Sequence, residues 1–324
     1  MKSTVLFCAA LAAFTPFLSA AETPAASETP VAVAEKSAAL PKLPWHMVNL
    51  WWKAPAVDDF TQFSIDVDIS QDVPAEAYNL YISTIYGHIN GEYYYGGIQT
   101  NVNGWDAMVP GDKKRLHGGH GFIFSRWSEK PTLSLDDVRA TPGGFVEAAG
   151  YEGHFVSGRR PYAWKAGKYT FTLRKLDTQI VDGKPFTWVG GFVLEHATGK
   201  EVFISALRFA GDTLKHDGMN SAFMEFYATE KLWKPPVLAA LPPLVVKYSN
   251  LRFNGAPADM DKISARFIRK DEKRGDGLSS PISPNLLHVK ASDDGREITC
   301  TLVNRPFADS EEPGRTLWEK PKAK

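Results

Sequence analysis

The sequence predicts an all-β protein in which two antiparallel sheets pack face to face. Three observations carry this prediction: apolar side chains alternate with polar ones at a period of two, turn residues recur at short intervals, and no long segment has a helical period. The chain of 324 residues also holds 9 Trp, 11 Tyr and 19 Phe, enough large rings for a big buried core. These features together are typical of a two-sheet β-sandwich.

The clearest strands run from Phe63 to Ile69 and from Tyr169 to Leu173, where every second residue is apolar. Each pattern predicts a strand with one buried face. Further β-rich runs span Tyr78 to Tyr86, Tyr93 to Val102, Gly121 to Trp127, Phe186 to Leu194, Glu201 to Phe209, Ser221 to Tyr227 and Leu244 to Phe253. Turn sequences separate them, among them Asn90-Gly91, Pro110-Gly111-Asp112, Pro142-Gly143-Gly144, Asp182-Gly183-Lys184 and Thr198-Gly199-Lys200.

The N-terminus has the order of a secretory signal. Lys2 precedes an apolar run from Val5 to Leu18, and small residues follow up to Ala21, so we expect residues 1–21 to be a signal peptide. Residues 22–44 are rich in Ala, Pro, Thr and Ser and contain no aromatic side chain, which predicts a disordered linker. The expected location is therefore periplasmic or extracellular, and no membrane span is expected in the mature chain.

The predicted domains are a β-sandwich over residues 45–254 and a small C-terminal extension over 255–324. In the extension, Met260, Ile263, Phe267 and Ile268 have the spacing of one buried helical stripe, and a β-hairpin is expected further along, at Leu286 to Val289 and Glu297 to Val303. Cys300 is the one cysteine left after removal of the signal peptide, so no internal disulfide is expected.

The charge balance argues against charged polymeric partners. Lys plus Arg equals Asp plus Glu at 37 each, so the chain has neither the basic surface of a nucleic-acid-binding protein nor a polybasic stretch for anionic lipid. A neutral partner fits this composition better. Nucleotide and redox chemistry are also disfavoured, because phosphate-loop and paired-cysteine motifs are absent from the sequence.

Four segments together resemble a known family. They are Tyr95-Gly96-Gly97-Ile98-Gln99, Ile123-Phe124-Ser125-Arg126-Trp127-Ser128, Glu152-Gly153, and Trp164 through Phe171. In this order, over roughly residues 45–227, the chain is similar to the family called domain of unknown function 3472. The resemblance implies a jelly-roll fold like that of the concanavalin-type lectins and glucanases, and its link to sugars is an analogy of fold. The chain departs from the family in the loop Tyr151 to Phe155 and in a longer insertion from Asn103 to Gly119.

The predicted ligand-binding residues begin on the strand after Asn90-Gly91. Alternation places Tyr93, Tyr95, Gln99 and Asn101 on one face; if Ile98 is in the core, that face points outward. Aromatic rings stack on the C–H face of a pyranose, and amides both donate to and accept from its hydroxyl groups. The alternative is that the tyrosines merely cover the sheet.

Arg126, Glu152 and Trp164 complete the predicted site. Arg126 and Trp127 point to opposite faces, so only one of the two side chains lies on a ligand-binding face. Glu152 precedes two loop arginines and is the best candidate for a catalytic acid. We expect Tyr95 and Trp164 to stack on sugar rings, Gln99 and Asn101 to bind hydroxyl groups, and Arg126 and Glu152 to orient a carbohydrate or cell-envelope glycan.

Two other classes of function remain open: a polysaccharide hydrolase or lyase, and a structural or protein-binding module. A polysaccharide hydrolase needs two carboxylates at a defined separation, and the Glu-x-Asp-x-x-Glu motif of jelly-roll glucanases is absent. A lyase of the alginate type would use the residue types of Gln99, Arg126, His120, His154 and Tyr162, but its Arg-x-Glu-Leu-Arg element is missing. A purely structural or protein-binding module is the remaining alternative.

Metal sites are weakly indicated, and no cofactor is expected. Asp66 and Asp68 share a strand face and are weak candidates for calcium, which prefers oxygen ligands. His117 and His120 lie close in sequence but lack an obvious third ligand.

Overall fold

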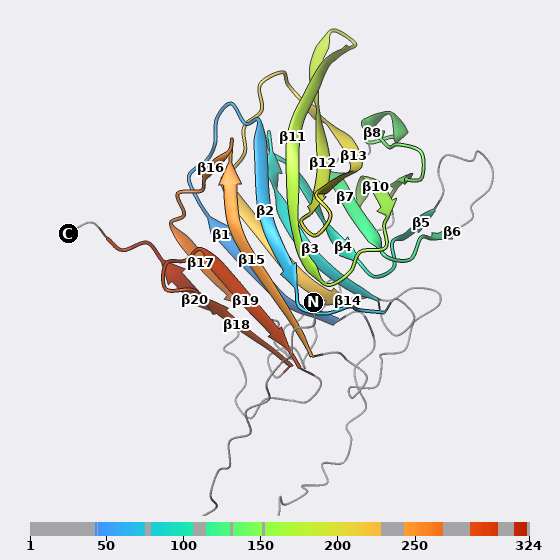
Figure 1. The fold of residues 1–324 in the computed structure, drawn as a ribbon. Coiled ribbons are helices and arrows are strands. Elements are labelled where there is room, and N and C mark those ends of the chain that lie inside the picture. The colour runs from blue at the N-terminus through green and yellow to red at the C-terminus, as the bar shows by residue number, and fades with distance from the viewer. Residues whose placement is uncertain are drawn as a thin grey trace, which may run out of the picture. The chain divides into compact units, whose positions relative to one another are not determined.

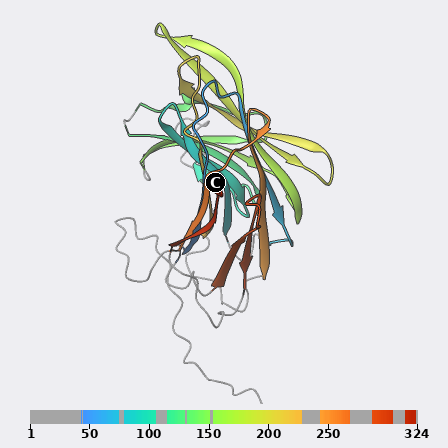
Figure 2. The ribbon, with the colours of Figure 1, turned by 90° about the vertical axis from the view of Figure 1, so that its left-hand side faces the viewer.

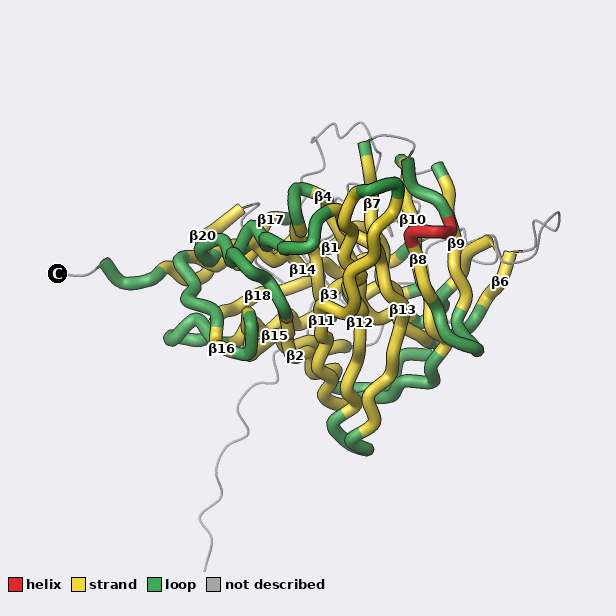
Figure 3. Tube along the Cα trace, turned by 90° about the horizontal axis from the view of Figure 1, so that it is seen from above, coloured by secondary structure: helices red, strands yellow, loops and turns green. Residues whose placement is uncertain are grey.

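The computed structural model describes residues 43, 45–74, 79–105, 115–129, 132–150, 153–227, 243–267, 286–303 and 314–322. The predicted signal peptide, the predicted linker apart from Leu43, and Glu152 lie outside these residues. Residues 40–324 form one compact unit. Most of the described residues lie in strands, and one short helical turn, η1 (Leu135–Asp137), is drawn red beside β8 in Figure 3.

The protein is a two-sheet antiparallel β-sandwich, as predicted (Figures 1 and 2). Every paired strand in both large sheets is antiparallel to its neighbour. Sheet A has the order β20 (Gly314–Glu319), β17 (Lys262–Arg266), β1 (Trp45–Lys53), β14 (Met219–Phe226), β3 (Leu80–Ile89), β4 (Glu92–Gln99), β7 (Gly121–Ser128), β10 (His154–Pro161) and β9 (Phe145–Ala149).

Sheet B lies against sheet A. Its order is β18 (Leu287–Ala291), β19 (Glu297–Leu302), β15 (Leu244–Phe253), β2 (Gln62–Ile69), β11 (Gly167–Val181), β12 (Lys184–Glu195), β13 (Lys200–Ala210) and β8 (Val138–Arg139), with β16 (Ala256–Pro257) paired to β15. A separate two-stranded sheet joins β5 (Asn103–Trp105) to β6 (Arg115–His117) within the insertion noted in the sequence.

The core fills the space between the two sheets. Ring contacts cross it at several points: Phe122 of β7 meets Phe171 of β11 with ring centroids 5.8 Å apart, and Trp52 of β1 meets Tyr248 of β15 at 5.8 Å. Alternating residues of each strand supply this layer, so Ile65 and Val67 of β2 are 1% and 0% exposed. The period of two in the sequence is thus the pleat of strands whose inner faces meet.

Two hairpins turn where the sequence predicts them. Asn90 and Gly91 join β3 to β4 with φ of 51° and 80°, and Asp182 and Gly183 join β11 to β12 with φ of 49° and 75°. Two successive positive φ values define the type I′ turn, whose twist matches that of the flanking strands. The long β11–β12 hairpin projects beyond the other strands at the top of Figure 1.

The C-terminal extension is part of the sandwich and not a separate module. The predicted hairpin exists as β18 and β19, which join sheet B, whereas β17 and β20 extend sheet A. The helix predicted around Met260 is wrong over Lys262–Arg266, which forms strand β17. Ile263 and Ala265 are buried at a period of two, and pairing with β1 satisfies backbone groups that a helix would have bonded internally.

Candidate functional site

The outer face of sheet A carries the predicted tyrosine row. Tyr94 and Ile98 point into the core and are fully buried, so Tyr93, Tyr95 and Gln99 point away from sheet B. This is the arrangement expected if Ile98 is a core residue.

A continuous set of aromatic rings covers this outer face. It spans β1, β14, β3, β4 and β7, because the antiparallel register places outward side chains of neighbouring strands opposite one another. We call it the aromatic face; its members are Trp51, Tyr81, Tyr86, His88, Tyr93, Tyr95, Trp127 and Phe223.

Ring contacts connect the aromatic face from one side to the other. Tyr95 stacks on Trp127 with centroids 4.1 Å apart, and Tyr93 stacks on the same indole at 5.4 Å. Tyr86 connects Tyr93, at 6.3 Å, to Trp51, at 5.9 Å. Tyr93, Tyr95, Tyr86 and Trp51 are all half-buried, so each presents part of its ring at the surface.

Tyr93 and Tyr86 of this face are held as neutral phenols by burial. Burial raises the pKa of Tyr93 to about 12 and also raises the pKa of Tyr86. A neutral phenol both donates and accepts a hydrogen bond, whereas a phenolate only accepts. At the edge of the face, His88 Nδ1 lies 2.8 Å from an oxygen of Asp217.

Gln99 and Asn101 have different positions. Gln99 ends β4 on the outer face, opposite Tyr81 on one side and Gly121 on the other, and is 7% exposed. Asn101 lies beyond the end of β4 and is 9% exposed; its backbone carbonyl accepts a hydrogen bond from the Tyr227 hydroxyl at 2.5 Å. The predicted row therefore holds for Tyr95 and Gln99 but does not continue to Asn101.

Arg126 does not lie on the ligand-facing side. Its side chain points between the sheets, is 4% exposed, forms an ion pair with Glu92, and lies 5.1 Å above the ring of Phe209 in sheet B. Trp127, the other member of the pair, is the outward one. The physical reason is that Glu92 compensates the buried charge, so the strand can present its indole to the outer face.

Trp164 is also not available to stack on a ligand. Its ring is 1% exposed, its Nε1 donates to the backbone carbonyl of Gln99 at 2.8 Å, and it stacks on His120 at 4.6 Å. The side chain instead ties the segment after β10 to the end of β4. Its role in the structure is to hold His120 in place.

The two calcium candidates lie on the outer face of sheet B. Asp66 accepts hydrogen bonds from Lys168 at 2.7 Å, Thr170 at 2.6 Å and Asn250 at 2.8 Å, while Asp68 is exposed. Burial alone would raise the Asp66 pKa, but these hydrogen bonds outweigh it and lower the pKa. Among the described residues no three His, Cys, Asp or Glu side chains come together as a metal site.

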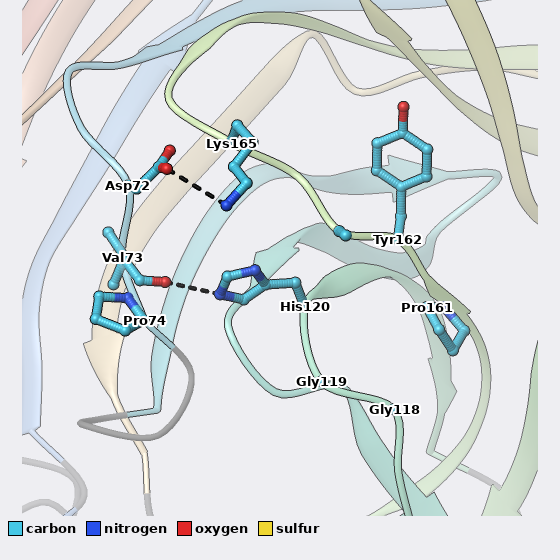
Figure 4. A pocket seen from close by; sticks show the side chains of 10 residues that line it. Asp72, Val73, Pro74, Gly118, Gly119, His120, Pro161, Tyr162 and Lys165 are labelled. Carbon is cyan, nitrogen blue, oxygen red and sulfur yellow. Dashed lines mark hydrogen bonds and ion pairs between the residues drawn. The ribbon is translucent and has the colours of Figure 1, made fainter.

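A pocket opens at the end of the sandwich, where β2, β7 and β10 meet their connecting segments (Figure 4). We call it the end pocket. Its volume is about 780 Å³, within the usual range of small-molecule sites. It is lined by Asp72, Val73, Pro74, Gly118, Gly119, His120, Pro161, Tyr162, Ala163 and Lys165.

His120 and Tyr162 both line this pocket, but they do not form an acid–base pair. His120 Nε2 donates to the carbonyl of Val73 at 2.7 Å, while the Tyr162 ring points away from His120 in Figure 4 and donates to Glu195 at 2.8 Å. Burial and the hydrogen bond to Glu195 raise the Tyr162 pKa to about 12, which disfavours the phenolate a general base requires. Arg126, another member of the lyase set, is buried between the sheets and paired with Glu92, and it does not line the pocket.

The outer face of sheet A also holds a buried ion pair that the sequence did not predict. Arg159 of β10 lies 2.8 Å from Glu147 of β9, and their side chains are 7% and 1% exposed. Strand β5 crosses over the pair at Gly104, where a Cβ atom would lie 2.8 Å from a Glu147 oxygen. No local motif marks Glu147, because the pairing of β9 with β10 brings the two side chains together.

No family model matches the chain, and no curated protein matches it. Among solved structures, the chain is similar to the crystal structure of Scytalido-glutamic peptidase with a peptide-based transition-state analogue. The two share 12% sequence identity and a TM-score of 0.34, over 80% of this chain and 100% of that chain. A likeness of this size says nothing about activity. No helix among the described residues is long and apolar enough to cross a membrane.

Proposed function

We propose that this chain is an exported protein that binds a carbohydrate, such as a cell-envelope glycan, through the aromatic face of sheet A. The observation that carries the proposal is the connected run of rings from Trp51 through Tyr86, Tyr93 and the buried Trp127 to Tyr95, in which every ring except Trp127 is half-buried. Export rests on the sequence of residues 1–21.

A sugar chain fits such a surface for a physical reason. The rings give flat apolar area for the C–H faces of successive pyranoses, and the neutral Tyr93 and Tyr86 hydroxyl groups exchange hydrogen bonds with sugar hydroxyl groups. The rings are held by their neighbours, so little side-chain entropy is lost on binding. The balanced charge of the chain agrees with a neutral ligand.

Binding is favoured over catalysis by the positions of the charged residues. Glu147 of β9, one of the carboxylates on the outer face of sheet A, is 1% exposed and paired with Arg159. His120 and Tyr162 hydrogen-bond to other partners and do not converge on one point. Hydrolysis or elimination needs an acid and a base that meet at the same bond.

The proposal is tested by measuring affinity for a panel of soluble glucans, xylans and mannans and for solubilised peptidoglycan, with isothermal titration calorimetry. We expect at least one polysaccharide to bind. Tyr93→Ala and Tyr86→Ala should each weaken that binding about fivefold, because one stacked ring is worth roughly 1 kcal/mol.

Phe192→Ala is the matched control. Phe192 is a half-buried ring on the outer face of sheet B, packed against Phe203 at 5.2 Å, so its loss should leave the affinity unchanged. Circular dichroism of each variant confirms that the fold persists. Equal affinities for wild type, Tyr93→Ala and Tyr86→Ala would rule out the aromatic face as the binding surface.

A further inference from the structure

We propose that the end pocket is a second binding site, which takes the end of a neutral, hydroxyl-rich glycan and discriminates against acidic sugars. This inference rests on the proposed glycan binding and adds the ligand class and the place where a chain end is held. The pocket is the cavity shown in Figure 4, with a volume of about 780 Å³.

Asp72 and Lys165 form the charged part of the pocket. The Asp72 carboxylate accepts a hydrogen bond from the backbone amide of Ala166 at 2.7 Å. That bond holds the Asp72 pKa below its usual range, so the group stays ionised. The Lys165 ammonium lies 3.4 Å from the other Asp72 oxygen, and both side chains are more than half exposed to the pocket and solvent.

His120 contributes an acceptor in a defined position. A carbonyl oxygen only accepts, so the hydrogen bond to Val73 at 2.7 Å places the proton of the neutral imidazole on Nε2. The lone pair is then on Nδ1, which takes part in none of the hydrogen bonds formed among the described residues and points toward the Lys165 side of the pocket in Figure 4. Stacking on Trp164 at 4.6 Å prevents the ring from turning.

The donor and acceptor inventory selects hydroxyl groups. Lys165 supplies donors, whereas Asp72 and His120 Nδ1 supply acceptors, and a hydroxyl group satisfies both kinds at once. A uronate carboxylate has only acceptors at neutral pH, so if it lay in the pocket it would meet the Asp72 charge and the His120 lone pair without a proton to offer. Lys165 already has Asp72 as its counter-charge.

The register of sheet A relates the end pocket to one member of the aromatic face, Tyr81, which lies opposite Gln99. Gln99 lies opposite Gly121, and Gly121 lies opposite Pro161, which lines the pocket. Gln99 also accepts the Trp164 hydrogen bond that holds His120. The pocket therefore lies two strands from Gln99, at the same end of β4, β7 and β10.

The test uses short sugars that occupy the pocket without spanning the aromatic face. The probes are cellotriose, mannotriose and chitotriose as neutral trisaccharides and trigalacturonate as the acidic one, titrated into the purified mature protein. We expect a neutral trisaccharide to bind more tightly than trigalacturonate. Asp72→Asn and Lys165→Gln should each weaken it about tenfold, the size expected for one hydrogen bond to a charged group.

Matched controls separate the pocket from general effects of charge. Asp68→Asn removes an exposed carboxylate of sheet B, and Lys184→Gln removes an exposed lysine at the β11–β12 turn; both should bind the trisaccharide as wild type does. Asp72→Asn keeps an oxygen for the Ala166 amide, so the variant should fold. Tyr93→Ala should leave trisaccharide binding unchanged while weakening polysaccharide binding.

The outcomes distinguish the two proposals. If a polysaccharide binds and Tyr93→Ala weakens it, but the pocket variants bind trisaccharides as wild type or no trisaccharide binds, the end-pocket inference is overturned and the proposed function stands. Tighter binding of trigalacturonate than of every neutral sugar also overturns the inference. If no glycan of either length binds, both proposals fail.

Discussion

A buried histidine should make the fold sensitive to mild acid. His216 lies between the two sheets with 0% of its surface exposed, 4.8 Å from the ring of Phe253 and 6.0 Å from that of Phe63. Its Nδ1 accepts a hydrogen bond from the backbone amide of Gly218 at 3.0 Å. The proton of the neutral ring is therefore on Nε2, which donates to Tyr94 at 2.6 Å.

Protonation of His216 is costly in the folded state. A second proton would have to sit on Nδ1, facing an N–H donor, and the charge would have no water around it. Burial lowers the His216 pKa from 6.5 to about 4, with Asp217 opposing the shift in part. The difference of about 2.5 units, at 1.36 kcal/mol per unit, corresponds to about 3 kcal/mol.

The sign follows from which state takes up the proton first. Below pH 6.5 the unfolded chain binds a proton at this position and the folded chain does not, so the free energy of unfolding falls as the pH drops from 6.5 to about 4. Above pH 6.5 the full contribution is present. The pKa of Asp66 is lowered from 3.8, so its contribution to the free energy of unfolding is lost only at pH values below this range.

The assay is urea unfolding followed by tryptophan fluorescence at pH values from 7 to 4. His216→Gln keeps a donor and an acceptor but does not titrate, so its loss of stability over this range should be about 3 kcal/mol smaller than that of wild type. The control is His196→Gln, at an exposed imidazole, which should follow the wild-type curve.

An unchanged pH dependence in His216→Gln would refute this reasoning. Should that variant fail to fold, the wild-type protein still provides a test by nuclear magnetic resonance. The chemical shifts of the His216 ring protons should not change between pH 7 and pH 5. A titration of these shifts with a midpoint near pH 6.5 would also refute the reasoning.

Two further predictions concern stability. Gly218→Ala should cost at least about 2 kcal/mol more than Gly255→Ala in urea unfolding: both glycines have φ near +80°, but only at Gly218 would a Cβ meet a backbone carbonyl oxygen, at 2.2 Å. Equal losses of stability in the two glycine variants would show that the backbone relaxes around the new atom. Arg126→Met should lower the free energy of unfolding by about 3 kcal/mol, because it leaves the partly buried Glu92 carboxylate without its ion-pair partner, and it should leave glycan affinity unchanged. Arg174→Met, at an exposed ion pair, should lower the free energy of unfolding by less than about 1 kcal/mol. Reduced glycan affinity in a stable Arg126→Met protein would instead support the role of Arg126 in ligand binding that the sequence predicts.

Local sequence determined the strands and the composition of each face. The alternation around Tyr94 and Ile98 was enough to put Tyr95 and Gln99 together on the outward side of β4, and Asn90-Gly91 was enough to place the turn before it. Both are consequences of backbone geometry over a few residues, which is why they can be predicted without knowledge of the partners.

Long-range pairing decided the rest. Alternation shows which side chains share a face but not which face is inward, and here both faces of sheet A bury aromatic rings, so hydrophobicity alone did not orient Arg126 and Trp127. Trp164 was drawn into the core by a hydrogen bond to a strand 65 residues away, and β17 became a strand because β1 had an edge to pair. Residues a few positions apart thus specify the strands and their period of two. The orientation of each face follows from contacts between segments distant in the chain, because the competing arrangements differ only in those contacts.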